Sequence, residues 1–127
     1  MADAHLTALR SSVARLHELT AGLTDDQLTG RAYPSEWTIA DVLSHLGSGA
    51  VITQRRLDDT IAGQETPEDF APGVWDDWNA KPPLAQRDDA LAADASLLAS
   101  LDAVTTEQRS AFVPEMGPMT LDFAQFV

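Results

Sequence analysis

The chain has 127 residues and a formal net charge of −12, which comes from 20 acidic and 8 basic residues. So acidic a surface repels phosphate backbones and anionic lipids, which excludes nucleic acids and membrane surfaces as expected partners. The length suffices for one domain with a buried core, and the sequence contains no run of about 18 apolar residues that would form a transmembrane helix.

The sequence contains no cysteine, which excludes disulfides, thiolate metal ligands and a cysteine nucleophile. Any metal ligands must then be histidines and carboxylates, a set that suits zinc or another divalent transition metal. The first ten residues lack the apolar segment of a signal peptide, so the cytoplasm is the expected location.

Two helices are expected in the first half of the chain. The first covers residues 4–21 and ends before Gly22, because apolar side chains recur there at helical spacing. These side chains are Leu6, Leu9, Val13, Leu16 and Leu23. The second begins after Thr38, a good N-cap with Asp41 at the third helical position, and ends at Gly63. Its expected buried face consists of Ile39, Val42, Leu43, Leu46, Ala50, Leu57 and Ile61.

A proline-rich connection is expected over residues 64–83. A third helix is expected to follow Pro82 and Pro83, with an apolar face of Leu84, Leu91, Ala95, Leu98 and Leu101. Trp75 and Trp78 lie three residues apart in the connection, so they can share one face of a helical turn. They are expected to anchor the connection on the core. The alternative is that either indole lines a binding cleft.

A fourth helix is expected to begin after Thr120, and the sequence ends inside it at Val127. Because the other helices are expected to be much longer, we expect this helix to continue beyond Val127 and the domain of residues 1–127 to be incomplete. The alternative is a native end that completes the bundle by forming a homodimer. With no convincing strand, the expected fold is all-α, an up-and-down four-helix bundle whose fourth helix is cut short.

His45 is the strongest candidate for a metal ligand. On a helical wheel it lies at the border of the apolar face of the second helix, so its imidazole can point into the mouth of the bundle. Gly49, one turn later, leaves open space beside the ring. Asp41, one turn earlier, is expected to accept a hydrogen bond from the other ring nitrogen and fix the tautomer. The alternative is a partly buried histidine that hydrogen-bonds a backbone carbonyl.

The other candidate residues have weaker support for a functional role. His5 and His17 have no neighbouring ligand at useful spacing and are expected near the surface. Trp37 precedes the second helix and is expected to plug the end of the bundle. A catalytic zinc site needs three protein ligands and an open position, so His45 alone does not make one. No catalytic residue is identified.

Two stretches of the sequence resemble a known family. Residues 34–46, PSEWTIADVLSHL, resemble the signature of the DinB-like superfamily. More narrowly, they resemble the N-terminal domain of mycothiol-dependent maleylpyruvate isomerases, with a tryptophan, a capping threonine, Asp-Val-Leu and then His-Leu. Residues 74–81, VWDDWNAK, also resemble members of that family. The similarity covers residues 5–126.

The resemblance implies a four-helix bundle with a divalent metal, often zinc, of which His45 is one ligand. The family's other ligands lie on the fourth helix as a Glu or His followed four residues later by a His, so here they are expected beyond Val127. The resemblance also implies a thiol cofactor, mycothiol, that attacks a small electrophile in an isomerase or transferase reaction. The alternative is a non-catalytic bundle that binds a small molecule or a partner after losing its metal site.

Overall fold

The computed structural model describes residues 2–32, 36–112, 115–116, 119–120 and 123–127. Three long helices dominate them: α1 (Ala2–Thr20), α3 (Ile39–Ile61) and α5 (Pro83–Asp102). Four shorter helices stand between and after these: α2 (Asp25–Leu28), α4 (Phe70–Asn79), α6 (Thr106–Ala111) and α7 (Phe123–Phe126). The predicted all-α bundle is therefore confirmed.

Local sequence signals set where the helices begin. Thr38 caps α3 as predicted: its side chain accepts a hydrogen bond from the backbone N–H of Asp41, and the Asp41 carboxylate accepts one from the backbone N–H of Thr38. This reciprocal pair is a capping box, which satisfies donors that the first helical turn would leave unpaired. α2 and α6 begin with the same device, on Thr24 and Thr105.

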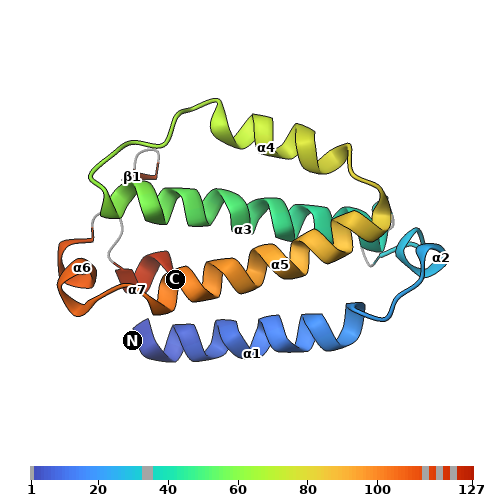
Figure 1. Cartoon of the computed structure of the whole chain (residues 1–127), viewed down its shortest axis with the longest axis horizontal. Coiled ribbons are helices and arrows are strands. Elements are labelled where there is room, and N and C mark those ends of the chain that lie inside the picture. The colour runs from blue at the N-terminus through green and yellow to red at the C-terminus, as the bar shows by residue number, and fades with distance from the viewer. Residues whose placement is uncertain (1, 33–35, 113–114, 117–118, 121–122) are drawn as a thin grey trace.

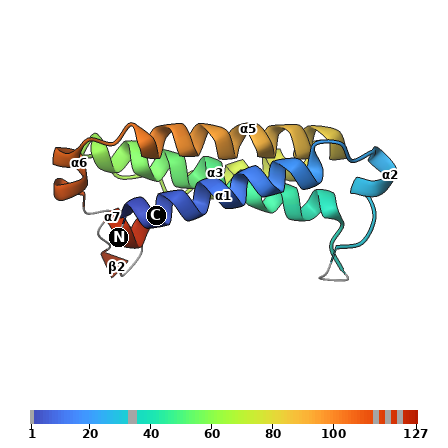
Figure 2. The ribbon, with the colours of Figure 1, turned by 90° about the horizontal axis from the view of Figure 1, so that it is seen from below.

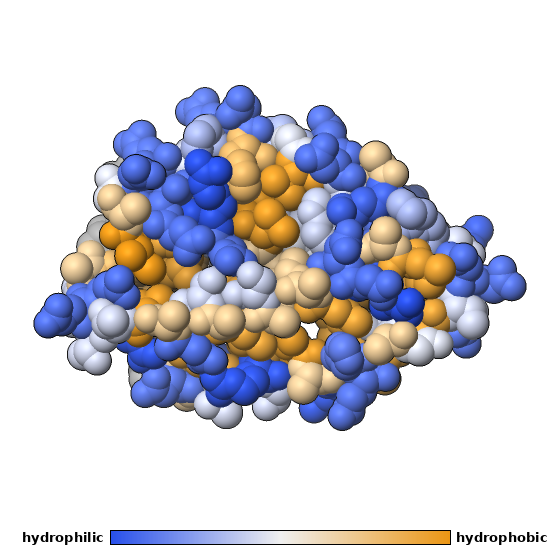
Figure 3. Space-filling view, viewed as in Figure 1, coloured by the Kyte–Doolittle hydropathy of each residue, from blue (hydrophilic) through white to orange (hydrophobic). Residues whose placement is uncertain are grey.

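The helices run alternately up and down in an elongated bundle (Figure 1). α3 and α5 lie side by side in the centre, α4 packs on α3, and α1 packs on α5. In the view from below, α1 lies alongside this pair over most of its length (Figure 2). On the face seen in Figure 3, hydrophilic residues dominate the rim and apolar residues show mainly between the helices.

The buried face of α3 differs from the predicted one. Leu46 and Ile61 were expected inside, but both are exposed, Leu46 by 41%. The helix instead buries the side that carries Gly47, where α5 and α4 come very close. Two small residues, Gly47 on α3 and Ala90 on α5, permit this approach, so close packing outweighs the burial of larger side chains on the neighbouring flank.

The core has two parts. The part near the N-terminus of α3 consists of Leu28, Ala40, Leu43, Trp78 and Ala90. The part at the opposite end consists of Leu6, Ala50, Leu57, Leu97, Leu101, Val104, Phe112 and Phe123. No helix within the described ranges is long and apolar enough to cross a membrane.

The end of the chain differs in detail from the prediction. Thr120 does not cap a helix, because it lies in a short antiparallel hairpin of β1 (Glu115–Met116) and β2 (Met119–Thr120), where it pairs with Glu115. The expected fourth helix is represented by α7, which begins at Phe123. Phe123 packs edge-on against Phe112, with ring centroids 5.4 Å apart. This contact places α7 against the part of the core that contains Leu57 and Leu101.

A buried arginine joins α1 to α5. The Arg87 guanidinium donates hydrogen bonds from Nη1 to the backbone carbonyls of Thr20, Ala21 and Leu23, at 3.1, 2.8 and 3.0 Å. These carbonyls belong to the last residue of α1 and to the turn that follows it, the region where a helix leaves backbone carbonyls without helical partners. A positive charge there also interacts favourably with the helix dipole.

Candidate functional site

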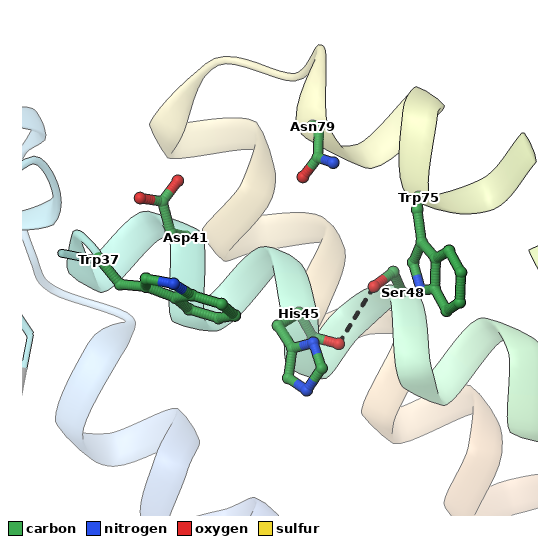
Figure 4. A pocket seen from close by; sticks show the side chains of 6 residues that line it. All are labelled: Trp37, Asp41, His45, Ser48, Trp75 and Asn79. Atoms are coloured by element: carbon green, nitrogen blue, oxygen red, sulfur yellow. Dashed lines mark hydrogen bonds between the residues drawn. The ribbon is translucent and has the colours of Figure 1, made fainter. Parts of the chain in front are cut away.

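A pocket of about 390 Å³ lies between the N-terminal half of α3 and the last turns of α4 (Figure 4). Pockets that hold small molecules begin at about 300 Å³, so this one can take a compact ligand. Its lining residues are Trp37, Asp41, His45, Ser48, Trp75 and Asn79.

His45, the predicted metal ligand, lines this pocket on α3 and is exposed. Its ring stands edge-on to the Trp37 ring, with centroids 5.6 Å apart and planes at 72°. Among the described residues, no hydrogen bond engages either ring nitrogen; the Ser48 hydroxyl donates to the backbone carbonyl of His45 instead. A Cβ placed on Gly49 would meet nothing within 4 Å, so space is open on that flank, as expected. The imidazole is therefore accessible to a ligand.

Asp41 also lines the pocket, but its carboxylate is engaged in the helix cap. Oδ2 accepts the backbone N–H of Thr38 at 2.9 Å, and the side chain points away from the His45 ring (Figure 4). The role predicted for Asp41, accepting a hydrogen bond from His45, has no counterpart among the hydrogen bonds of the described residues and stays a prediction.

The other two histidines lie outside the pocket. His17 is exposed on α1. His5 is also exposed, and its Nδ1 lies 2.9 Å from the backbone carbonyl of Ala124, which links α1 to α7. Neither is placed near His45 in the lining of the pocket.

The described part of the chain holds no group of three or more histidine, aspartate or glutamate side chains arranged to bind a metal ion. His45 by itself fits the requirement for a single ligand: an accessible imidazole on a rigid helix beside open space. Among the described residues, His45 is thus one candidate ligand, whereas a catalytic zinc requires three protein ligands.

The two tryptophans of α4 have different environments. Trp78 is only 6% exposed and packs against Gly47 of α3, as the anchoring interpretation predicted. Trp75 is 48% exposed and lines the pocket, which matches the alternative of a binding cleft. Asn79 stands one helical turn after Trp75 and faces the same pocket. Sequence reasoning missed Asn79, although its spacing from Trp75 places both on one face of a helix.

The pocket wall formed by α4 is anchored at its C-terminal end. Gln86 donates a hydrogen bond from Nε2 to the backbone carbonyl of Trp78 at 3.0 Å, and Gln86 is itself buried. The Lys81 ammonium pairs with Asp89 at 2.7 Å and lies 5.0 Å from the centre of the Trp78 ring. These contacts fix the turn between α4 and α5, which keeps Asn79 in place.

A second group of contacts anchors the N-terminal end of α4. Buried Asp59 on α3 accepts hydrogen bonds on Oδ2 from Arg55 and from the Thr66 hydroxyl, both at 2.8 Å. The Arg55 guanidinium also lies 4.7 Å from the centre of the Phe70 ring, at the start of α4. Contacts at both ends therefore join α4 to the rest of the bundle and position it as one wall of the pocket.

Fold and site together define a helical bundle with an accessible histidine on its second long helix, facing a pocket of small-molecule size. The family model for the mycothiol maleylpyruvate isomerase N-terminal domain matches residues 9–126. The chain belongs to this family, which confirms the resemblance seen in the motif around His45. No curated protein and no solved structure matches the chain.

Proposed function

We propose that this domain is the metal-binding part of a mycothiol-dependent isomerase or transferase, with His45 as one ligand of a divalent metal, zinc being the best chemical fit. The family, that of the mycothiol maleylpyruvate isomerase N-terminal domain, supports the link to a thiol cofactor. The observation that carries the proposal is the position of His45: an imidazole without a hydrogen-bond partner among the described residues, at the wall of a pocket.

The remaining metal ligands are proposed to follow Val127. Phe123 of α7 and Leu57 of α3 belong to one core cluster, and Leu57 is taken as the point on α3 at the level of Phe123. His45 precedes Leu57 by 12 positions in the sequence, about 18 Å of helix. A helix that continued α7 antiparallel to α3 would therefore reach the level of His45 about 12 residues after Phe123, which is about eight residues after Val127. A Glu or His and a His one turn later are expected near that level.

A bound metal would lower the pKa of a coordinated thiol and so provide a nucleophile near neutral pH. The chain's own residues have supporting roles. His45 offers a nitrogen lone pair from a fixed helix, and the indole of Trp75 excludes water from one side of the pocket. The Asn79 side chain can donate and accept hydrogen bonds with a polar group of the ligand. A small electrophile is the proposed substrate.

This chemistry implies a location where small thiols stay reduced, which is the cytoplasm. A homodimer remains a proposal as well, and the molecular mass in solution tests it.

The proposed activity is tested by following mycothiol-dependent isomerisation of maleylpyruvate by the natural-length protein. The His45→Ala variant is expected to lose more than about 100-fold in kcat/KM, because it removes a metal ligand. His17→Ala is the matched control, since His17 is exposed on α1 and does not line the pocket. Equal activity of the His45→Ala and His17→Ala variants would contradict the proposal.

The second candidate is a non-catalytic bundle that binds a small molecule. It is favoured by one observation: the described residues form a pocket but hold no group of three metal-binding side chains. This candidate predicts ligand binding that persists in the His45→Ala variant and in the presence of a chelator. Mycothiol transfer or isomerisation by the natural-length protein would remove it.

A further inference from the structure

The ring of Trp37 is the one aromatic neighbour of the His45 ring among the described residues. The centroids lie 5.6 Å apart and the planes are inclined by 72°, an edge-on arrangement that aromatic pairs prefer. Trp37 is exposed and does not plug the end of the bundle, contrary to the sequence-based expectation. Neither core cluster of the described residues includes Trp37, whereas the pocket lining does.

The backbone around Trp37 is fixed by hydrogen bonds. Ala32 donates its N–H to the carbonyl of Trp37 at 2.8 Å, and Ile39 donates its N–H to the carbonyl of Gly30 at 3.0 Å. The next residue, Thr38, is locked in the capping box of α3. Trp37 therefore stands at a defined place before the helix, from which its indole reaches a side chain eight positions later in the sequence.

Asp41, the other neighbour that could orient His45, is occupied elsewhere. Its Oδ2 caps α3 through Thr38, and in Figure 4 its carboxylate and the His45 ring point in different directions. The Trp37 indole, by contrast, extends along α3 toward His45 (Figure 4). An exposed imidazole without such a neighbour would exchange between staggered rotamers.

We propose that Trp37 is a positioning residue: its edge-on contact holds the His45 imidazole in one rotamer, with a ring nitrogen presented to the ligand in the pocket. The expected effect on metal affinity rests on the proposed function. The contact between the Trp37 and His45 rings does not depend on it. Neighbours that orient a metal-binding histidine strengthen metal affinity about 10- to 100-fold when they hydrogen-bond the ring. An aromatic edge contact is weaker, and about 3- to 10-fold is expected here.

The first test uses nuclear magnetic resonance of the histidine ring protons in the full chain, with His45 assigned through a His45→Gln variant. In Trp37→Leu the His45 signals are expected to move to the positions of an exposed histidine, because the indole ring current is lost. Trp37→Phe should retain a large part of the original shift. His17, on α1, is the internal reference and should not move. Unchanged His45 signals in Trp37→Leu would overturn the proposal.

The second test measures Zn²⁺ affinity of the natural-length protein by titration. Trp37→Leu is expected to bind about 3- to 10-fold more weakly, with recovery in Trp37→Phe. Equal affinity of wild type and Trp37→Leu, combined with loss of binding in His45→Ala, would overturn the positioning role. If the wild type itself binds no Zn²⁺, the proposed function fails, and the ring-proton signals alone decide whether Trp37 positions His45.

Discussion

Replacing Gly47 with alanine should destabilise the fold, whereas the same change at Gly49 should not. A Cβ at position 47 would lie 2.5 Å from Cη2 of Trp78 and 2.8 Å from Cα of Ala90. The second of these atoms belongs to the backbone of α5, so the clash is relieved only if two helices move apart. A Cβ at position 49 of the same helix would meet nothing within 4 Å.

The expected size of the effect follows from two opposing terms. Overfilling a packed core costs about 1–3 kcal/mol, and a clash with backbone belongs at the upper end of that range. Alanine gains about 1 kcal/mol over glycine in a helix interior. Gly47→Ala should therefore lower the free energy of unfolding by about 2 kcal/mol, and Gly49→Ala should raise it by up to about 1 kcal/mol.

Equilibrium unfolding in urea, followed by far-ultraviolet circular dichroism, measures both variants against wild type. The two are expected to differ from each other by about 3 kcal/mol, on opposite sides of the wild type. If Gly47→Ala were as stable as Gly49→Ala, the close approach of α3, α4 and α5 at this position would be refuted.

The other predictions concern the rest of the bundle. Arg87→Ala should lower the free energy of unfolding in urea by about 2–4 kcal/mol, because the buried guanidinium that donates to three carbonyls is lost. Arg10→Ala, which removes one partner of an exposed ion pair, is the control and should lower it by less than about 1 kcal/mol. Trp78→Ala should lower the free energy of unfolding by about 3–5 kcal/mol, whereas Trp75→Ala, which truncates a half-exposed indole, should lower it by less than about 1 kcal/mol. Equal decreases of the two melting temperatures would contradict the different environments of the two indoles. Burial raises the pKa of the Asp94 carboxyl above its usual 3.8, so the folded state binds this proton more tightly than the unfolded state. Asp94→Asn should therefore be more stable than wild type near neutral pH, with a gain that shrinks as the pH falls through the raised pKa toward 3.8, and a gain independent of pH would contradict this reasoning.

Local signals in the sequence predicted the start of α3 well, because a capping box depends on residues three apart. Thr38 and Asp41 form the expected capping box. The buried face of α3 was predicted incorrectly for a related reason. The side on which a helix packs depends on its partners, and the contact of Gly47 with Ala90 and Trp78 involves segments distant in sequence. The pattern of large apolar residues, Leu46 among them, pointed to the neighbouring flank.

The candidate site was predictable only in part. His45 stood out through its position at the border of the helix face and through the surrounding motif. The positions of Trp37 and Asn79 in the pocket could not be predicted in the same way, because they depend on how the segment before α3 folds and on where α4 packs. The pairing of β1 with β2 was also missed, since two-residue strands carry too few side chains to form an alternating pattern.

The metal content of the purified protein shows whether His45 ligates a metal ion, as proposed. The natural-length protein and its His45→Ala and His17→Ala variants should be purified without chelator, and zinc and nickel measured by elemental analysis. Stoichiometric metal is expected in wild type and in His17→Ala, and little or none in His45→Ala. Stoichiometric metal in the His45→Ala variant would show that His45 is not a ligand.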